Sequence, residues 1–382
     1  MTSTAIVLAA GFGTRMKSAL PKALHRIAGR PMLRHLLASC EAAFDRVVVV
    51  VGPDMDAVAA VAAPHQCVVQ HDRLGTAHAA LQAASLFGDG EVAVLYADNP
   101  LITPATLRRL LQRRGEGDAG LALLAMRPAD PAKYGRVVAA DGLVERIVEW
   151  TEASAAERAI GLCNAGVLCG PAADIHAWLS AVRADNAKGE YYLTDLVGLA
   201  RADGRKVAVV EAPEAELRGV NSRVELAAAE ATVQGWLRHA AMEAGVTMTA
   251  PETVFLQADT RFAQDVTIGP NVVFGPGVSV AAGVEIRAFC HLEGCELAEG
   301  AVIGPYARLR PGTVVGKNAH VGNFVELKAT QLGEAVKANH LSYLGDADVG
   351  ADAMAFGRAR QTELPGRAAA FRAAQRKNKE TT

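Results

Sequence analysis

The chain has 382 residues, of which 51% are hydrophobic and 21% are charged, and its formal net charge is −2. This length and composition are those of a soluble globular protein with room for two domains. A net charge this small provides no overall basic field for nucleic acid or a membrane surface, so we expect neither as a partner.

The cysteines and the apolar segments exclude further classes. The six cysteines contain no Cys-x-x-Cys pair, which argues against a zinc site or a disulfide framework and favours reduced thiols. The N-terminal segment has a short apolar run with no basic region before it, and predicts a first strand instead of a signal peptide. No run of about 18 apolar residues follows, so we expect a cytoplasmic protein without a transmembrane segment.

Short apolar runs alternate with helical segments in the first part of the chain. Strands are predicted at 4–10, 46–52 and 91–98, and helices at 31–43, 56–63 and 75–87. This order predicts an α/β, Rossmann-like domain over 1–221 with a mostly parallel sheet and helices on both faces. Ligands bind to such sheets beyond the carboxyl ends of the strands. Residues 222–243 have apolar positions at helical spacing and no proline, so we expect a linker helix over 222–244.

A six-residue period replaces the helical period after Gly245. In phase it reads "IGPNVV FGPGVS VAAGVE IRAFCH" and, after a five-residue spacer, "LAEGAV IGPYAR LRPGTV VGKNAH VGNFVE". One apolar anchor every six residues, often followed by a small residue, predicts a hexapeptide-repeat, left-handed parallel β-helix with inward anchors. Ile268 to Gly350 suffices for about four to five coils. We place the β-helix at 245–350 and a basic tail at 351–382.

The loop after the first strand, "LAAGFGTRMKSALPK" (Leu8–Lys22), favours phosphate binding. Its small residues expose backbone N–H groups, and Arg15 and Lys22 add positive charge. Such a loop suits a nucleoside triphosphate. The alternative is a structural turn with two solvated basic residues.

A second candidate element, "YADNPLI", follows the apolar strand at 91–98. An Asp at the carboxyl end of a central strand can hold Mg²⁺ together with substrate phosphates, which makes Asp98 the candidate ligand. The alternative is that Asp98 caps a helix beginning near Thr103.

Several segments together carry a resemblance to one bacterial family. They are "LAAGFGTRMKSALPK", "QHDRLGTAHA", "YADNPL", "YGRVV", "GEYYLTD" and "GVNSRVELA" in the first part, and "ARLRPG" and "HVGNFVELK" in the repeat. In these segments the chain resembles the bifunctional N-acetylglucosamine-1-phosphate uridylyltransferase / glucosamine-1-phosphate acetyltransferase of bacteria. The resemblance covers residues 4 to about 350 and includes the order of the two domains.

The resemblance implies uridylyl transfer from UTP to N-acetylglucosamine-1-phosphate, giving UDP-N-acetylglucosamine for peptidoglycan and lipopolysaccharide precursors. Asp98 and Asn221 would hold Mg²⁺, while Arg15 and Lys22 would stabilise the leaving pyrophosphate. The implied nucleotide-binding residues are Leu8, Ala9, Ala10, Gly11, Lys22, Gln70, Gly75, Thr76, Tyr96 and Ala97, and the sugar-binding residues are Gly135, Glu149 and Asn164. Taken alone, Gln70 reads as a polar strand end, Asn164 as a turn former and Asn221 as a helix cap.

The chain departs from the family at a few positions of this site. Ala97 replaces the more usual Gly, and its methyl group would weaken nucleotide binding where the backbone approaches the ligand. Ala165 replaces the more usual Thr, and "EWTEA" at 149–153 replaces "EHKDA".

The repeat segments "ARLRPG", "HVGNFVELK" and "ANHLSYLGDA" match the acetyltransferase half of the family. The resemblance implies that Arg310 and Lys328 bind the sugar phosphate and that Tyr343 helps to hold it. His340 would take the amine proton of glucosamine-1-phosphate during attack on acetyl-CoA. Without the resemblance, His340 would be read as a surface histidine at a coil corner.

The family's "NIGAGT" and "NYDG" elements do not occur here, and Met354 stands where the family has an Asn. We therefore expect a Mg²⁺-dependent uridylyltransferase, homotrimeric through its β-helix, in which acetyl transfer is impaired. One alternative is that both activities survive, with the tail or a neighbouring subunit supplying the acetyl-CoA site. Another is a non-catalytic partner of a full-length homologue, against which intact Lys22, Asp98 and Asn221 argue.

Overall fold

The computed structural model describes residues 2–116, 119–131, 134–186 and 188–355. It divides into two compact units, Met1–Leu237 and Arg238–Thr382, which are described separately. No helix among the described residues is long and apolar enough to cross a membrane. Most of the basic tail expected from the sequence lies outside the described residues.

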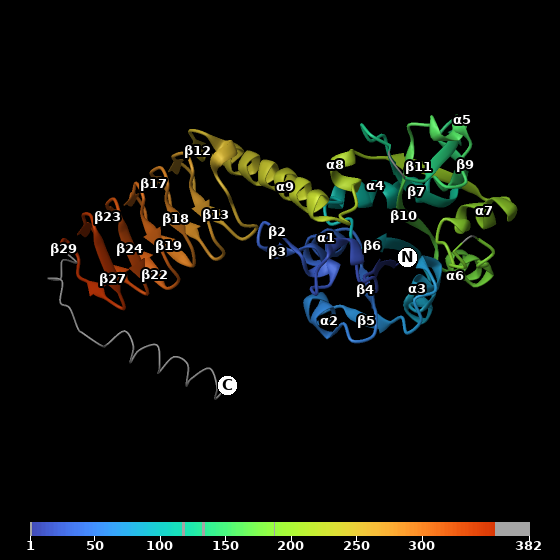
Figure 1. The fold of residues 1–382 in the computed structure, drawn as a ribbon, viewed down its shortest axis with the longest axis horizontal. Coiled ribbons are helices and arrows are strands. Elements are labelled where there is room, and N and C mark those ends of the chain that lie inside the picture. The colour runs from blue at the N-terminus through green and yellow to red at the C-terminus, as the bar shows by residue number, and fades with distance from the viewer. Residues whose placement is uncertain (1, 117–118, 132–133, 187, 356–382) are drawn as a thin grey trace. The chain divides into compact units, whose positions relative to one another are not determined.

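The first unit is built on a nine-stranded sheet with the strand order β5-β4-β1-β6-β10-β7-β11-β9-β8 (Figure 1). Its strands are β1 (Ser3–Leu8), β4 (Arg46–Val51), β5 (Gln66–Val69), β6 (Glu91–Tyr96), β7 (Ala119–Met126), β8 (Arg136–Ala140), β9 (Leu143–Val148), β10 (Cys163–Pro171) and β11 (Lys206–Glu211). From β5 to β6 all neighbours are parallel, whereas β10 is antiparallel to both β6 and β7. The α/β fold expected from the sequence is confirmed.

Helices cover both faces of this sheet. On one face are α1 (Met32–Glu41), α2 (Asp56–Ala62) and α4 (Pro104–Gly115), and on the other are α3 (Thr76–Leu81), α6 (Ala172–Ala181) and α7 (Asp195–Ala202). Successive strand residues alternate between the two cores, so Ala5 and Val7 pack on the first face and Ile6 and Leu8 on the second. Burial on both faces is why these strands read as continuous apolar runs.

The strand order reverses at β1. From β1 the chain moves outward to β4 and β5, and then returns to form β6 on the other side of β1. Leu8 pairs with Tyr96, so β1 and β6 end side by side. Ligands of parallel sheets bind at such a switch point, which places the candidate site between the loops that follow Leu8 and Tyr96.

The long helix α9 (Arg223–Glu243) begins in the first unit and ends in the second, and it is preceded by the short helices α5 (Ala155–Arg158) and α8 (Glu214–Leu217). A small hairpin of β2 (Arg26–Ile27) and β3 (Arg30–Pro31) precedes α1. Ser222 caps α9, because its Oγ accepts a hydrogen bond from the Glu225 backbone N–H (3.2 Å) and donates one to the Glu225 carboxylate (3.0 Å).

The second unit is a parallel β-helix with three sheets (Figure 1). The first sheet holds β12 (Thr247–Met248), β14 (Thr267–Ile268), β17 (Glu285–Ile286), β20 (Val302–Ile303), β23 (His320–Val321), β26 (Lys337–Ala338) and β29 (Met354–Ala355). The second holds β13 (Arg261–Phe262), β16 (Ser279–Val280), β19 (Cys295–Leu297), β22 (Thr313–Val315), β25 (Gln331–Leu332) and β28 (Asp348–Val349). The third holds β15 (Val273–Phe274), β18 (His291–Leu292), β21 (Arg308–Leu309), β24 (Val325–Lys328) and β27 (Ser342–Gly345).

The hexad anchors form the core of the β-helix. Every predicted anchor from Ile268 to Val321 has at most 3% of its surface exposed. Leu292, in the predicted five-residue spacer, is also fully buried and pairs with both Phe274 and Leu309. The spacer is therefore a repeat shortened by one residue. Strand pairing also continues past Gly350, where the sequence period predicted the end of the repeat, because β29 pairs with β26.

One corner of the β-helix carries an exposed apolar strip, formed by Phe289, Tyr306, Phe324 and Leu341. Each of these residues is 48–63% exposed and has a φ between 51° and 60°. Phe289 and Tyr306 stack with ring centroids 4.8 Å apart, and Tyr306 and Phe324 with centroids 5.2 Å apart. Non-glycine residues rarely adopt this left-handed conformation, which turns the chain at successive corners and brings the side chains into register.

Candidate active site

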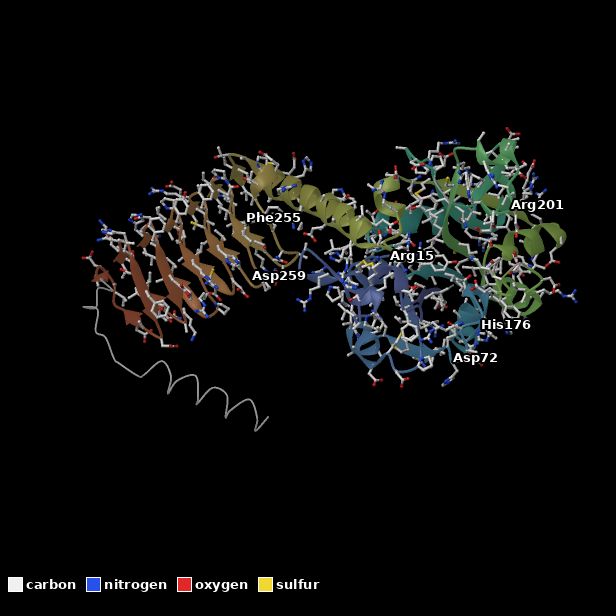
Figure 2. All side chains as sticks on the ribbon, viewed as in Figure 1. Arg15, Asp72, His176, Arg201, Phe255 and Asp259 are labelled. Atoms are coloured by element: carbon white, nitrogen blue, oxygen red, sulfur yellow. The ribbon has the colours of Figure 1, made fainter. Side chains whose placement is uncertain are left out.

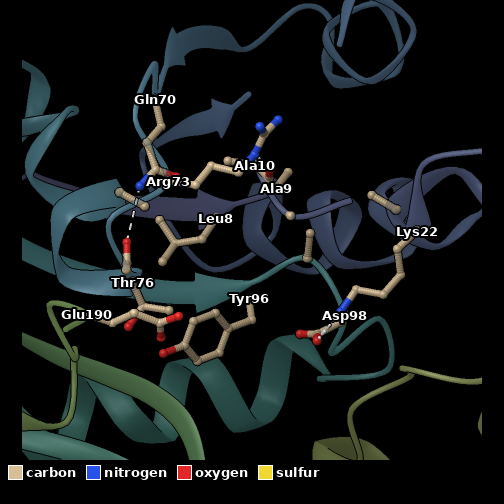
Figure 3. A pocket seen from close by; sticks show the side chains of 15 residues that line it. Leu8, Ala9, Ala10, Lys22, Gln70, Arg73, Thr76, Tyr96, Asp98 and Glu190 are labelled. Carbon is tan, nitrogen blue, oxygen red and sulfur yellow. Dashed lines mark hydrogen bonds and ion pairs between the residues drawn. The ribbon is translucent and has the colours of Figure 1, made fainter. Parts of the chain in front are cut away.

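A pocket of about 270 Å³ opens beyond the carboxyl ends of β1 and β6 (Figure 3). Many of the residues predicted to bind the nucleotide line it, namely Leu8, Ala9, Ala10, Gly11, Lys22, Gln70, Gly75, Thr76, Tyr96, Ala97 and Asp98. Residues from distant parts of the sequence thus meet at the switch point of the sheet. The pocket is large enough for part of a nucleotide and is open on one side.

The two glycines of the phosphate loop have different structural roles. Gly13 has a φ of +68°, and a Cβ there would lie 2.5 Å from Cβ of Lys22, so only glycine allows the loop to pack against Lys22. A Cβ on Gly11 would meet nothing within 4 Å. Gly11 therefore leaves open space at the pocket, where a phosphate could approach the backbone closely.

Lys22 lies between the two predicted metal ligands. Its ammonium donates to Oδ2 of Asp98 (2.6 Å) and to Oδ1 of Asn221 (2.9 Å). Arg15, labelled in Figure 2, donates to the same Oδ1 of Asn221 (3.0 Å). Two cationic side chains and two oxygen atoms that could bind a metal thus converge, although they come from three separate segments of the chain. The Lys22 and Asp98 side chains are 17% and 21% exposed, so solvent screens their ion pair only in part.

Neither Asp98 nor Asn221 is used as a helix cap. Thr103 caps α4, since its side chain accepts a hydrogen bond from the Thr106 backbone N–H. Ser222 caps α9. The backbone N–H of Val220 donates to the Asp98 carbonyl (2.7 Å), which brings the segment before α9 against the end of β6. Both side chains are therefore left to face Lys22.

The opposite end of the pocket is built from the segment between β5 and α3. Gln70 is 3% exposed, and its amide donates to the Gly75 carbonyl (3.2 Å). A Cβ on Gly75 would lie 2.4 Å from the carbonyl oxygen of Tyr191, so the "GEYYLTD" segment backs directly onto this turn. Tyr96 hydrogen-bonds with Thr76, and burial raises the pKa of Tyr96 to about 12, so its hydroxyl keeps its proton at neutral pH.

The structure adds residues that the sequence did not single out. Arg73 and Glu190 also line the pocket. Nε of Arg73 donates to the Ala10 carbonyl (2.9 Å), and its guanidinium carbon lies 3.9 Å from the centroid of the Phe12 ring. The only sequence signal for Arg73 was its place in the "QHDRLGTAHA" segment.

Of the predicted sugar-binding residues, Glu149 and Asn164 line neighbouring hollows and not the nucleotide pocket, whereas Gly135 lies beside Glu149. Glu149 lines a hollow of about 510 Å³ together with Glu152 and Asp195, and burial raises the pKa values of Glu149 and Asp195. Asn164 lines a small hollow that also includes Tyr96.

These hollows are linked to the nucleotide pocket through shared residues. Tyr96 lines both the nucleotide pocket and the small hollow, and Ile147 and Thr194 line both the small hollow and that of Glu149. The Asn164 backbone N–H donates to the Gly135 carbonyl (2.9 Å), and Asn164 Oδ1 also accepts from the Gly166 N–H (3.0 Å), as a turn former does.

In the β-helix, the residues predicted for acetyl transfer lie on neighbouring coils of the third sheet. Leu309 pairs with Leu327, so Arg310 and Lys328 stand at equivalent positions of successive coils. Arg310 forms an ion pair with Glu326 (3.1 Å). Tyr343 is 55% exposed and covers Gly345, and His340 lies just before β27 and is exposed.

The residues at the end of β6 fit a divalent cation. Asp98 and Asn221 offer one carboxylate and one amide oxygen, the hard donors that such ions prefer, and both already face a cation in Lys22. The described residues contain no cluster of three or more His, Cys, Asp or Glu side chains that could hold a metal. A cation bound here would take its other ligands from substrate phosphates and water, as Mg²⁺ commonly does.

Similar proteins identify the class of protein to which each part of the chain is related. Residues 5–166 match the MobA-like NTP transferase domain, and residues 294–329 match the bacterial transferase hexapeptide family of six repeats. A Bacillus anthracis chain solved as a candidate glucose-1-phosphate thymidylyltransferase with sucrose aligns with a TM-score of 0.50. That alignment has 18% identity and covers 60% of this chain and 94% of the other, which shows the fold alone. These matches place an NTP transferase domain before a segment of bacterial transferase hexapeptide repeats.

Curated relatives identify the family. A protein of Gluconacetobacter diazotrophicus is 64% identical over 91% of this chain and 76% of its own length. One of Acidiphilium cryptum is 64% identical over 92% of this chain and 80% of its own. Both are named bifunctional protein GlmU, and the chain belongs to this family. The resemblance expected from the motifs is confirmed.

Proposed function

We propose that the first unit transfers the uridylyl group of UTP to N-acetylglucosamine-1-phosphate, giving UDP-N-acetylglucosamine and pyrophosphate. The observation that carries this proposal is the convergence of Lys22, Asp98 and Asn221 at the switch point of the sheet, in a chain of this family. The product would supply precursors of the cell envelope. Because nucleotides and sugar phosphates are cytoplasmic metabolites, we place the reaction in the cytoplasm.

The chemistry needs charge neutralisation and alignment more than a protein nucleophile. A phosphate oxygen of the sugar phosphate attacks the α-phosphorus of UTP, and the bond from the α-phosphorus to the bridging oxygen breaks as pyrophosphate leaves. The backbone N–H groups of the loop at 10–11 hold phosphate, and Lys22 and Arg15 stabilise the charge that builds on the leaving group. When bound by Asp98 and Asn221, Mg²⁺ would neutralise phosphate charge.

The two ends of the site account for substrate choice in this proposal. Gln70, Gly75 and Thr76 read the uracil through the turn that Tyr191 supports. Glu149 accepts hydrogen bonds from hydroxyl groups of the sugar, with Gly135 and Asn164 beside it. Ala97 is 4% exposed and lines the pocket, so the effect of its methyl group on nucleotide affinity is expected to be modest.

For acetyl transfer from acetyl-CoA to glucosamine-1-phosphate, the second activity of the family, we propose that the sugar-phosphate site is kept, although Met354, where the family has an Asn, impairs the transfer. The supporting observation is the succession of Arg310 and Lys328 on neighbouring coils, where two cations can hold one phosphate. His340 is then the base that takes the amine proton. Release of free thiol from acetyl-CoA in the presence of glucosamine-1-phosphate measures this activity directly.

We also propose a homotrimer formed through the β-helix, in which a second copy covers the exposed apolar strip. Single exposed aromatic residues are ordinary, but a continuous stacked row is typical of an interaction surface. Sedimentation of the wild-type protein and of Tyr306→Glu tests this proposal. A trimer that Tyr306→Glu leaves intact would show that the strip lies outside the interface.

The uridylyl-transfer proposal is tested with UTP, Mg²⁺ and N-acetylglucosamine-1-phosphate by measuring pyrophosphate. We expect release by the wild-type protein, and loss of at least about 100-fold in Asp98→Ala, because the site loses the carboxylate that would hold the charge-neutralising metal at the reacting phosphates. Asp56→Ala, which removes an exposed carboxylate from α2, is the matched control and should keep full activity. No pyrophosphate from the wild-type protein would contradict the proposed function.

A further inference from the structure

The ammonium of Lys22 holds both oxygen atoms that the proposed metal site offers. It lies 2.6 Å from Oδ2 of Asp98 and 2.9 Å from Oδ1 of Asn221. Arg15 donates a second hydrogen bond to the same Asn221 oxygen (3.0 Å). Both oxygen atoms therefore already have cationic partners within the chain.

A divalent cation and this arrangement of Lys22 are mutually exclusive. A metal bound to both oxygens would lie in the space that the ammonium bridges, where two positive charges repel strongly. The metal must therefore displace Lys22 from a partly buried ion pair. Because solvent screens such a pair less than a surface pair, this displacement weakens metal binding appreciably.

A triphosphate would remove this obstacle. Its oxygens give Lys22 and Arg15 new acceptors on the same loop, where Gly11 leaves the backbone open to a ligand. Once the two basic side chains turn to phosphate, Asp98 and Asn221 are free to bind the cation. Before the nucleotide arrives, the lysine also keeps the Asp98 carboxylate from being left without a counter-ion.

We propose that Lys22 is a placeholder cation, which blocks the divalent-metal site in the ligand-free protein and yields it when a nucleoside triphosphate binds. This inference rests on the proposed function, because it takes Asp98 and Asn221 as metal ligands. It adds an order to the reaction, since the metal enters with the nucleotide and not before it. Lys22 then has two roles, as counter-ion before binding and as phosphate ligand afterwards.

The test measures Mn²⁺ binding to the full-length protein without nucleotide, by calorimetry and by the electron paramagnetic resonance signal of free Mn²⁺. Lys22→Met removes the charge but keeps an unbranched side chain, and we expect it to bind Mn²⁺ at least about tenfold more tightly than wild type. Lys22→Arg keeps a cation and should bind Mn²⁺ as weakly as wild type. Equal or weaker Mn²⁺ binding by a folded Lys22→Met would overturn the proposal.

Lys17→Met is the matched control, because Lys17 is an exposed lysine on the same loop. It should change Mn²⁺ affinity by less than about twofold, since long-range charge effects at the surface are screened. An equal gain in Lys17→Met and Lys22→Met would reveal a general charge effect and would also reject the placeholder role. Far-UV circular dichroism and thermal unfolding confirm that each variant is folded.

A double variant separates this inference from the proposed function. Adding Asp98→Asn to Lys22→Met should abolish the tight Mn²⁺ binding, because the metal loses its carboxylate ligand. If the tight binding persists, the metal lies elsewhere and the inference fails, whatever the transfer activity. If the Mn²⁺ results hold while the wild-type protein releases no pyrophosphate, the placeholder role stands and the proposed reaction fails.

Discussion

Arg73 shows how one side chain can hold the nucleotide loop in shape. It donates to the carbonyl of Ala10 and lies against the ring of Phe12, while Gly52 makes room for its guanidinium. A Cβ at Gly52 would lie 2.4 Å from one terminal nitrogen of Arg73. Because the Ala10 carbonyl is held by Arg73, the Ala10–Gly11 peptide plane is fixed beside the pocket.

We predict that Arg73→Ala raises the KM for UTP by about tenfold and changes kcat by less than about threefold. The reason is that a loosened loop binds phosphate less well, while the groups at the reacting phosphates stay in place. Steady-state kinetics at saturating sugar phosphate measure both constants. Arg201→Ala, which removes an exposed arginine from α7, is the control, and a fall in kcat alone would contradict a positioning role for Arg73.

Gly13 and Gly11 form a matched pair on the same loop. Gly13→Ala should lower the free energy of unfolding by about 1–2 kcal/mol and reduce pyrophosphate release, because the new Cβ strains a left-handed residue and pushes Lys22 away. Gly11→Ala should leave unfolding unchanged and raise only the KM for UTP. Urea unfolding and kinetics compare the two. Equal stability loss in both variants would show that Gly13 has no special contact with Lys22.

The raised pKa of Glu149 predicts a pH-dependent stability. Burial is the main cause, and Glu152 and Asp195 add to it. The folded pKa of Glu149 lies above the unfolded value of 4.5, so the protonated carboxyl favours the folded state. This contribution to the free energy of unfolding is fully present below about pH 4.5 and is lost as pH rises through the folded pKa. Glu149→Gln should therefore be more stable than wild type at pH 7, and this difference should vanish towards pH 4.5.

Urea midpoints measured from pH 4.5 to pH 8 test this prediction, with the exposed Glu145→Gln as the control. The same Glu149→Gln variant should bind the sugar phosphate less tightly, because an amide is a weaker acceptor than a carboxylate. A variant that is less stable than wild type at pH 7 would mean that the Glu149 carboxylate is satisfied by interactions that outweigh its burial.

At the scale of elements, the six-residue period was the most informative signal in the sequence. It identified Ile303, Leu309 and Val315 as inward anchors because burial at fixed spacing needs no long-range information. The sequence predicts a spacer at Leu292, because a repeat of five residues breaks the six-residue period. In the structure Leu292 still pairs with the strands of the coils before and after it. The helix expected at 75–87 divides into α3 and a 3-10 turn at Ala84–Leu86, a distinction that apolar spacing does not carry.

Two leucines on nearby coils test this view of the β-helix. Leu327 is a fully buried anchor, whereas Leu341 is 63% exposed on the apolar strip. Leu327→Ala should lower the free energy of unfolding by about 2–5 kcal/mol, because it leaves a cavity between two coils. Leu341→Ala should lower it by less than Leu327→Ala, because the Leu341 side chain lies outside the coil and its loss leaves no cavity between coils. Urea unfolding of the β-helix measures both, and similar losses in the two variants would contradict the inward assignment of Leu327.

The candidate site was predictable where its residues stand in one segment and hidden where the fold brings segments together. The small residues from Leu8 to Gly11 and the end of β6 carry local signals, since each follows a buried strand. The contacts of Lys22 with Asp98 and Asn221 join residues that are 76 and 199 positions apart. No local pattern predicts such contacts, and the bridging lysine became visible only in the structure.

At the scale of the whole molecule, each compact unit has its own core. Two clusters of buried apolar residues lie entirely in the first unit, on the two faces of its sheet, and the second unit is stabilised by contacts between successive coils. Units with independent cores can unfold separately. UTP binds only to the first unit in the proposed function, so it should stabilise that unit and leave the β-helix unchanged.

Differential scanning calorimetry should therefore show two transitions, of which UTP with Mg²⁺ shifts only one. At a UTP concentration about 100 times its Kd, the expected stabilisation is about 2.7 kcal/mol, because the ligand binds the folded state alone. Asp98→Ala should reduce this shift, since the nucleotide loses its metal. Leu327→Ala should lower the other transition and leave the UTP-dependent one in place. A single transition, or a UTP shift of both, would show that the two units unfold as one.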